Sequence, residues 1–91
     1  MLEIKKSKNK NKKYDAIIGD KVISFGAKGY PDYTNNSYDD PKAKRELYIK
    51  RHKAREDWTK INSGSLSRFI LWGDSSDINK NIRDYKKRFN L

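Results

Sequence analysis

The residues of this chain that could take part in acid–base or metal chemistry are few. His52 is the only histidine, and the carboxylate pairs closest to it in sequence are Asp39-Asp40 and Glu56-Asp57. One histidine beside such pairs is a weak metal set, because a metal site needs several ligands held close together. A lone histidine on a helix face is more often a packed, hydrogen-bonded residue than a general base.

Nucleophilic chemistry has no better support in the sequence. Ser63, Ser65 and Ser67 have no partner base near them, and a serine needs such a base to act as a nucleophile. The chain has no cysteine, which excludes disulfides and a thiolate zinc site. We therefore expect a protein that is not an enzyme, with no metal, no cofactor and no small-molecule substrate.

Positive charge is the dominant chemical feature of the chain. Lys and Arg number 22 against 12 Asp and Glu, which gives a net charge of +10. Self-repulsion of that size favours a polyanionic partner, of which nucleic acid is the commonest. The candidate residues for binding nucleic acid or an acidic partner lie in three basic segments: Lys5, Lys6, Lys8, Lys10, Lys12, Lys13, Lys44, Arg45, Lys50, Arg51, Lys53, Arg55, Lys86 and Lys87.

The central basic segment predicts a helix over about 41–56. Asp39 or Asp40 can cap it, and Pro41 suits the first turn, where its missing N–H would have no partner. No Gly or Pro interrupts the residues that follow, so helix propensity favours one continuous element. We expect this helix to pack one side and to show positive charge on the rest.

The clearest β pattern predicts a hairpin over 14–25, with a two-residue turn that starts at Gly19. A lone hairpin is marginal in water, so its apolar side must rest on another element. We expect Ile17, Ile23 and Phe25 to pack on the central helix.

The first thirteen residues are rich in lysine, and their only apolar members are Met1, Leu2 and Ile4. Such a segment buries too little surface to order itself, so we expect a basic arm that is disordered or ordered by a partner. The arm is either a solvated tail or a segment that follows phosphates or an acidic groove. In a further alternative, Leu2 and Ile4 add a strand to a neighbouring protein.

The remaining residues predict a loop over 26–38 and helices at about 65–72 and 77–89. Tyr30 and Tyr33 either pin the loop to the core or stack on an unpaired base. Trp72 is either a core residue or an aromatic contact for a partner. The apolar stripe of the last helix recurs at helical spacing and consists of Ile78, Ile82, Tyr85 and Phe89. The predicted fold class is α+β: one small domain over 14–91, a hairpin packed on about three helices.

Three stretches, KKYDAIIGDKVISFGAKGYPDYT, ELYIKRHKAREDWTK and SRFILWG, together resemble a known family. Its members are small basic proteins of uncharacterised function encoded by large DNA viruses of eukaryotes and by some large phages. The resemblance covers about residues 12–72. Its pattern is carried by Lys21, Val22, Phe25, Gly26, Tyr30, Asp32, Tyr33, Thr34, Tyr48, Ile49, Arg51, His52, Glu56, Asp57, Trp58, Ser67, Arg68, Leu71 and Trp72. The chain departs from the pattern between Asn35 and Asp40, where a His-containing link is usual, and over 63–66.

The resemblance implies a viral origin and a structural role in the virion. A small basic viral protein without catalytic groups is expected to be a minor capsid or cement protein, or one that bridges shell and genome. Its partners would be viral capsid proteins, packaged nucleic acid or both. It would be made in the host cell cytoplasm and located in the virion. The alternative is a nucleic-acid-binding or genome-compacting protein without sequence specificity. No membrane insertion is expected, because the longest apolar run, 69–72, is too short to cross a bilayer.

Overall fold

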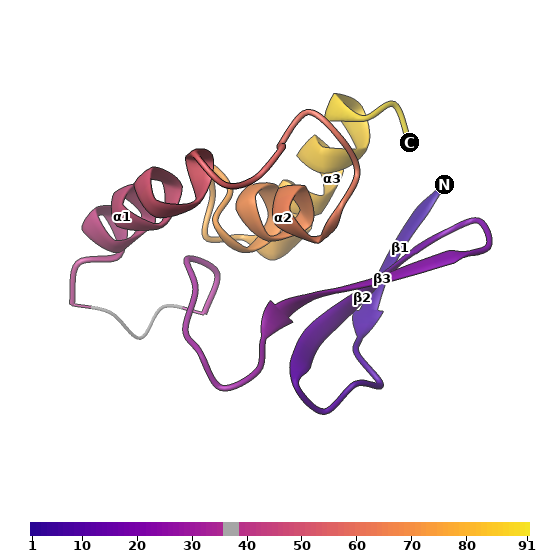
Figure 1. Cartoon of the computed structure of the whole chain (residues 1–91), viewed down its shortest axis with the longest axis horizontal. Helices are drawn as coiled ribbons and strands as arrows, with labels where there is room; N and C mark the ends of the chain where they lie inside the picture. The colour runs from indigo at the N-terminus through magenta and orange to yellow at the C-terminus, as the bar shows by residue number, and fades with distance from the viewer. Residues whose placement is uncertain (36–38) are drawn as a thin grey trace.

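The computed structural model describes residues 1–35 and 39–91, and it consists of an antiparallel sheet with helices on one side (Figure 1). The strands are β1 (Leu2–Lys6), β2 (Lys12–Ile18) and β3 (Lys21–Ala27), in the order β1-β2-β3. The helices are α1 (Pro41–Lys53), α2 (Ser63–Leu66), the π-helix η1 (Ser67–Leu71) and α3 (Ile78–Arg88). The predicted α+β class with one small domain is confirmed. The last three residues of the predicted loop over 26–38 lie outside the described residues.

The N-terminal segment is a strand of the sheet, so the prediction of a disordered basic arm over 1–13 is wrong. β1 pairs with β2 along its whole length, with Leu2 opposite Ile18 and Ile4 opposite Ala16. Leu2 is only 3% exposed. Side chains two positions apart share one face of a strand, so Leu2 and Ile4 both reach the core while the lysines stay in water.

The hairpin of β2 and β3 is confirmed, and it extends over 12–27 rather than 14–25. Gly19 has a φ of +59° at the first position of the turn between the paired residues Ile18 and Lys21. Glycine adopts this left-handed conformation without steric cost, which explains the tight turn. The register places Ile23 on the core face of the sheet, whereas Ile17 lies on the opposite face beside Glu3. Ile17 therefore does not take the core position predicted for it.

The core lies between the sheet and the C-terminal helices. Phe25, Leu66, Ile70 and Tyr85 have no exposed surface. The stripe of α3 packs against this core as its spacing predicts. β3 contacts α2 and η1, while α1 has no buried residue. The prediction that the hairpin rests on the central helix is therefore wrong, because the C-terminal helices occupy that place.

The helix predicted over 65–72 begins at Ser63, and it changes from an α-helix to a π-helix after Leu66. Its cap is Asn62, whose side chain accepts a hydrogen bond from the Ser65 backbone N–H at 2.8 Å, and Ser65 bonds back to the Asn62 N–H at 3.1 Å. This reciprocal capping satisfies two backbone donors, so Ser65 is the third helical residue and not the cap. After Leu66 the hydrogen bonds span five residues, as from the Trp72 N–H to the Ser67 carbonyl at 3.0 Å.

The end of β3 lies directly against η1. Gly26 has a φ of +80°, and a Cβ placed on it would lie 2.8 Å from the Leu71 side chain. Only glycine permits both this conformation and this close approach. The contact fixes the distance between the sheet and the π-helix.

The helix caps follow the sequence closely. The Asp40 side chain accepts from the Ala43 N–H at 3.1 Å, and Pro41 stands in the first turn as expected. α1 ends at Lys53, three residues before the predicted end. Asp77 caps α3 through the Asn79 N–H at 3.0 Å, within one residue of the predicted boundaries.

Candidate functional site

α1 carries a dense and almost unopposed positive charge. Between Pro41 and Lys53 it has six Lys and Arg residues and one acid, Glu46. Five of these cations are exposed: Lys42, Lys44, Lys50, Arg51 and Lys53. Like charges three or four positions apart repel each other on a helix surface. The cations of the last turn interact favourably with the helix dipole, whereas Lys42 and Lys44 near the N-terminus do not.

Arg45 and Tyr48 hold α1 against the rest of the molecule. The Arg45 Nε donates to the carbonyl oxygens of Gly73 at 2.8 Å and Trp72 at 3.2 Å, and its Nη2 pairs with Asp74 at 2.8 Å. The Tyr48 ring stacks on Trp72 with a centroid distance of 4.7 Å and an interplanar angle of 9°. Arg45 thus satisfies carbonyls just beyond the end of η1, where no helical N–H is present to do so.

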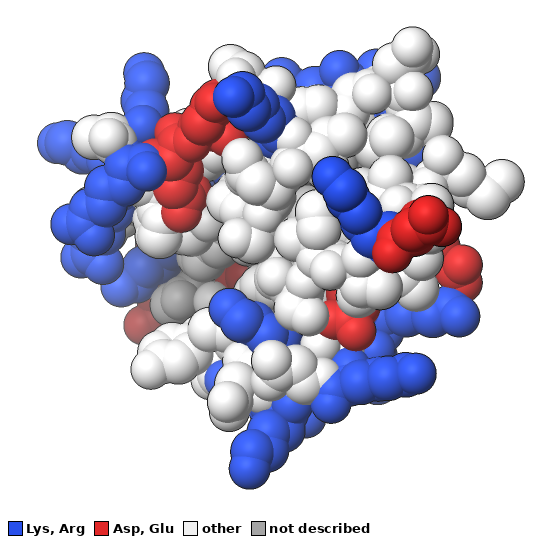
Figure 2. Space-filling view, turned by 45° about the vertical axis from the view of Figure 1, so that its right-hand side comes forward, with Lys and Arg blue, Asp and Glu red and all other residues white. Residues whose placement is uncertain are grey.

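Lys and Arg side chains gather on two parts of the visible surface. Figure 2 shows them at the left, on the side where α1 lies in Figure 1, and along the lower edge on the side of the sheet. Acidic side chains occur in smaller groups between them. This view thus shows a basic region on the side of α1 and another on the side of the sheet.

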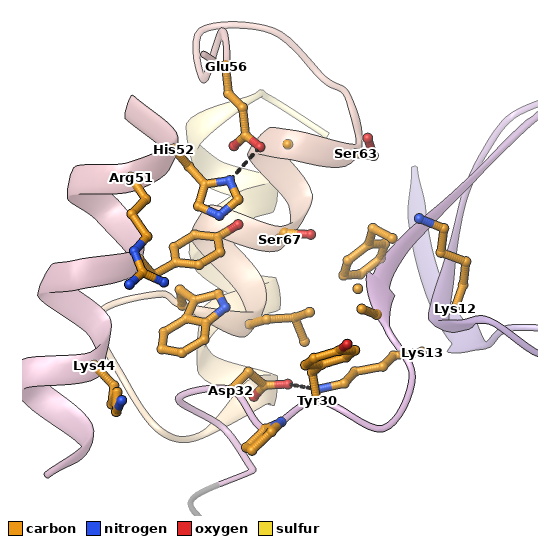
Figure 3. A pocket seen from close by; sticks show the side chains of 18 of the residues that line it. Lys12, Lys13, Tyr30, Asp32, Lys44, Arg51, His52, Glu56, Ser63 and Ser67 are labelled. Carbon is orange, nitrogen blue, oxygen red and sulfur yellow. Dashed lines mark hydrogen bonds and ion pairs between the residues drawn. The ribbon is translucent and has the colours of Figure 1, made fainter. Parts of the chain in front are cut away.

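A groove with a volume of about 460 Å³ separates α1 from the end of the sheet. Figure 3 shows Lys44 and Arg51 on the α1 side, Lys12 on the strand opposite, and Tyr30 and Asp32 on the loop below. Residues of α2 and η1 line the groove between these two walls. Helix, sheet and loop therefore bring together side chains that are far apart in the sequence.

Both carboxylates that line the groove are engaged in internal contacts. Asp32 is 3% exposed and pairs with the Lys13 Nζ at 2.5 Å. Its other oxygen accepts from the N–H groups of Thr34 at 2.8 Å and Asn35 at 3.0 Å. These bonds compensate for the burial of the charge and fix the start of the loop.

Glu56 is held in a similar way. Its carboxylate contacts the His52 Nδ1 at 2.9 Å and accepts from the Trp58 Nε1 at 2.8 Å. Because a carboxylate can only accept, the His52 Nδ1 carries the hydrogen in this contact. The single histidine is therefore a hydrogen-bonded, half-buried residue, as its sequence context predicts.

Three aromatic rings stack along the groove. His52 lies 4.2 Å from Tyr48, ring centroid to ring centroid, and Trp72 covers the Tyr48 ring at 4.7 Å. Burial raises the pKa of the Tyr48 hydroxyl, and the charge of Glu56 raises it further. Tyr48 therefore stays protonated at neutral pH and acts as a packing and hydrogen-bonding group.

The structure removes four of the proposed contact residues from the free surface. Lys13 pairs with the buried Asp32, and Arg45 is engaged by backbone carbonyls and Asp74. Trp72 is 8% exposed and belongs to the core, and Tyr33 packs against it. Tyr30, by contrast, is 70% exposed, so of the two tyrosines only Tyr33 pins the loop to the core.

The other proposed contact residues remain at least partly accessible. Lys12 and Lys86 are half-buried, and the rest are exposed: Lys5, Lys6, Lys8, Lys10, Lys44, Lys50, Arg51, Lys53, Arg55 and Lys87. Lys5 makes a surface ion pair with Glu3 at 3.2 Å, which contributes little to stability at such exposure. Lys12 and Arg51 line the same groove, although they are far apart in the sequence and nothing in the sequence predicts it.

Within the described part of the chain, no group of three or more His, Asp or Glu side chains is placed to hold a metal ion. None of the described helices combines the length and the apolar character that crossing a bilayer requires. Asp32 and Glu56 were not among the candidate site residues, because a carboxylate in a basic chain gives no local sign of the partner that it finds 19 or 4 positions away.

Comparison with known proteins adds a family. The model of a family of unknown function (DUF5754) matches residues 2–52, which is more than half of the chain. The chain belongs to this family. The match spans the sheet, the loop and most of α1, and therefore both walls of the groove. No curated protein and no solved structure matches the chain.

Proposed function

We propose that the protein is a small, non-catalytic basic protein that holds nucleic acid through phosphate contacts, as a structural component of a viral particle. The observation that carries the proposal is α1, a helix of 13 residues with no fully buried residue and five exposed cations against one acid. Cations spaced along one exposed element suit the regular charge of a nucleic-acid backbone.

The energetics of α1 support a binding role over a purely structural one. The helix gives the core no fully buried residue, and its like charges repel. A phosphate backbone would offset that repulsion and release condensed counterions. Lysines and arginines in this arrangement contact phosphate charge and not base edges, so binding is independent of sequence.

The viral setting rests on the resemblance of the sequence to small basic proteins of large DNA viruses. Within a particle, a basic protein of this size acts as a minor capsid or cement protein, or bridges shell and genome. The bridging role fits best with the surface, because only two of the four large apolar residues exposed in the described part of the chain share a site. Tyr30 and Leu47 line the groove, whereas Met1 and Val22 do not. A contact with capsid protein alone would favour a continuous apolar patch.

Binding to duplex DNA at increasing salt tests the nucleic-acid role. With roughly five to eight phosphate contacts, the slope of log K against log salt should be about −5 to −7. A variant with Lys42, Lys50 and Lys53 of α1 changed to Gln should flatten that slope by about 2 to 3. The matched control changes Lys21, Lys28 and Lys60, exposed lysines outside α1, and should leave most of the slope intact. Equal losses in the two variants would argue against α1 as the binding element.

The place in the particle needs a separate experiment. Mass spectrometry of purified particles against infected-cell lysate should find the protein enriched in the particles. Emptied particles washed at rising salt should then release the chain together with the genome if the nucleic-acid contacts dominate. The alternative result is that the chain stays on genome-free shells at salt concentrations that release it from free duplex DNA. That result would favour the minor capsid or cement role.

A further inference from the structure

The groove between α1 and the sheet has a chemical character that phosphate contacts on the outer face of α1 do not explain. Its lining has four Lys and Arg residues and two acids, and it includes exposed aromatic surface as well as charge. The two acids, Asp32 and Glu56, are each bound to an internal partner. The remaining charge in the groove is therefore positive on both walls, from Lys12 on β2 and Arg51 on α1.

Apolar surface is exposed at the same place. Of the four large apolar residues exposed in the described part of the chain, Tyr30 and Leu47 both line the groove, with exposed fractions of 70% and 44%. Apolar side chains exposed together mark ligand or partner sites, whereas single scattered ones carry no such meaning. Tyr30 gives the core little, so its ring is available to stack.

The π-helix is a second sign of function at the groove. Ser67 and Leu71, the first and last residues of η1, line it. π-Helical turns are rare and occur frequently at functional sites. Here the wider turn stands between the two charged walls, where Gly26 allows β3 to approach Leu71 closely.

We propose that this groove binds an unpaired base of a single-stranded nucleic acid, with the base against Tyr30 and the adjoining phosphates between Lys12 and Arg51. The inference rests on the proposed function and specifies which form of nucleic acid the groove takes. A base has a flat π-face that stacks on tyrosine, and the flanking phosphates match cations on two opposite walls. The volume falls within the range of about 300–1,000 Å³ typical of sites for small ligands, which excludes a duplex from the interior.

An acidic peptide is the competing occupant, and it fits less well. Its carboxylates would satisfy Lys12 and Arg51 but would leave the exposed ring of Tyr30 without a flat partner. Base stacking on an aromatic side chain adds affinity that depends on the base and not on charge alone. That difference makes the two occupants separable by experiment.

The decisive probes are an oligothymidylate and an abasic oligomer of the same length, about 12 nucleotides each, which is within the usual size of single-strand sites. Both carry the same phosphate charge, but only the first has bases. At a salt concentration of about 0.15 M, the oligothymidylate should bind the full chain at least about tenfold more tightly. Fluorescence anisotropy measures both affinities, and polyglutamate serves as a competitor of similar charge.

Point variants locate the preference in the groove. Tyr30→Ala should reduce the affinity for oligothymidylate to about that of the abasic oligomer, whereas Tyr30→Phe, which keeps the ring, should retain it. Arg51→Gln should weaken binding more than Lys53→Gln, which removes the same charge from the same helix outside the groove. Circular dichroism and thermal melts of each variant verify that it folds.

Equal affinity for the two oligomers, an unchanged Tyr30→Ala variant, or equally effective competition by polyglutamate would each overturn the groove proposal. If the protein still binds duplex with a steep salt dependence, the proposed function stands and only the groove assignment fails. If it binds neither duplex nor oligomer at low salt, both proposals fall together.

Discussion

Leu2→Ala is the sharpest test of the sheet, because it asks whether the basic N-terminus belongs to the fold. Leu2 is 3% exposed and pairs with Ile18 across β1 and β2. Removing a buried leucine side chain costs about 2–5 kcal/mol, depending on how well the site collapses. Near a chain end the backbone relaxes easily, so we expect the lower part of that range, about 2–3 kcal/mol.

This loss is large for a chain of this size. A stability of about 0.05–0.15 kcal/mol per residue gives roughly 5–14 kcal/mol for the whole domain. Each kcal/mol lowers the melting temperature of such a domain by about 4–8 °C. Leu2→Ala should therefore lower the Tm by about 10–20 °C, and urea unfolding should give the corresponding decrease in free energy.

Glu3→Ala is the matched control on the same strand. Glu3 points to the opposite face, and its ion pair with Lys5 is exposed, so its loss should cost less than about 0.5 kcal/mol. If Leu2→Ala changes stability no more than Glu3→Ala, then β1 does not dock on the core and the N-terminus is a tail after all.

Three further variants probe single contacts. Gly73→Ala should lower the free energy of unfolding by about 2–3 kcal/mol in a urea melt, because the added methyl would collide with the Phe69 carbonyl oxygen. Arg45→Lys keeps the charge but loses the planar fork, so it should cost about 1–2 kcal/mol and speed amide exchange in α1 while α3 stays protected. Hydrogen bonds from two serine hydroxyls lower the pKa of Asp15, and the bond from Ser24 has a larger effect than the bond from Ser7. The stability from these bonds is therefore present at neutral pH and is lost as the pH falls through the lowered pKa. An NMR titration should find that pKa below 3.8 and find it raised in Ser24→Ala.

The elements with strong local signals were predictable from the sequence. The apolar residues of α3 recur at helical spacing, and Asp77 caps the helix. Both features depend only on residues that are close in the sequence. The β2–β3 hairpin needs only its two-residue turn, for which Gly19 is suited. Such features depend on the chain close by, so neighbouring residues suffice to predict them.

β1 and the π-helix depend on contacts distant in the sequence. Four of the five residues from Leu2 to Lys6 are either charged or only partly buried, and only pairing with β2 orders them. The π-helical turn has no sequence signature of its own and lies where Gly26 and Leu71 meet across 45 positions of the chain. The composition of the first segment predicted disorder, because composition carries no information about pairing with another strand.

The candidate cations were predictable as a set, but their individual roles were not. A lysine that enters a buried pair, such as Lys13, has the same local sequence as Lys12, which lines the groove. Likewise Arg45 and Lys44 are neighbours, yet only the planar fork of Arg45 matches the carbonyls beyond η1. Tertiary placement decides which cation stabilises the fold and which stays exposed on the surface.

The division between core and charge explains how a chain with a net charge of +10 can fold. The apolar contacts lie between the sheet, α2, η1 and α3, while α1 contributes no buried residue. In water two unit charges 4 Å apart interact by only about 1 kcal/mol, and salt screens them further. Exposed cations on α1 therefore cost the fold little, whereas the buried Asp32 requires Lys13 at 2.5 Å. Because α1 gives the core no fully buried residue, core packing does not constrain its exposed cations.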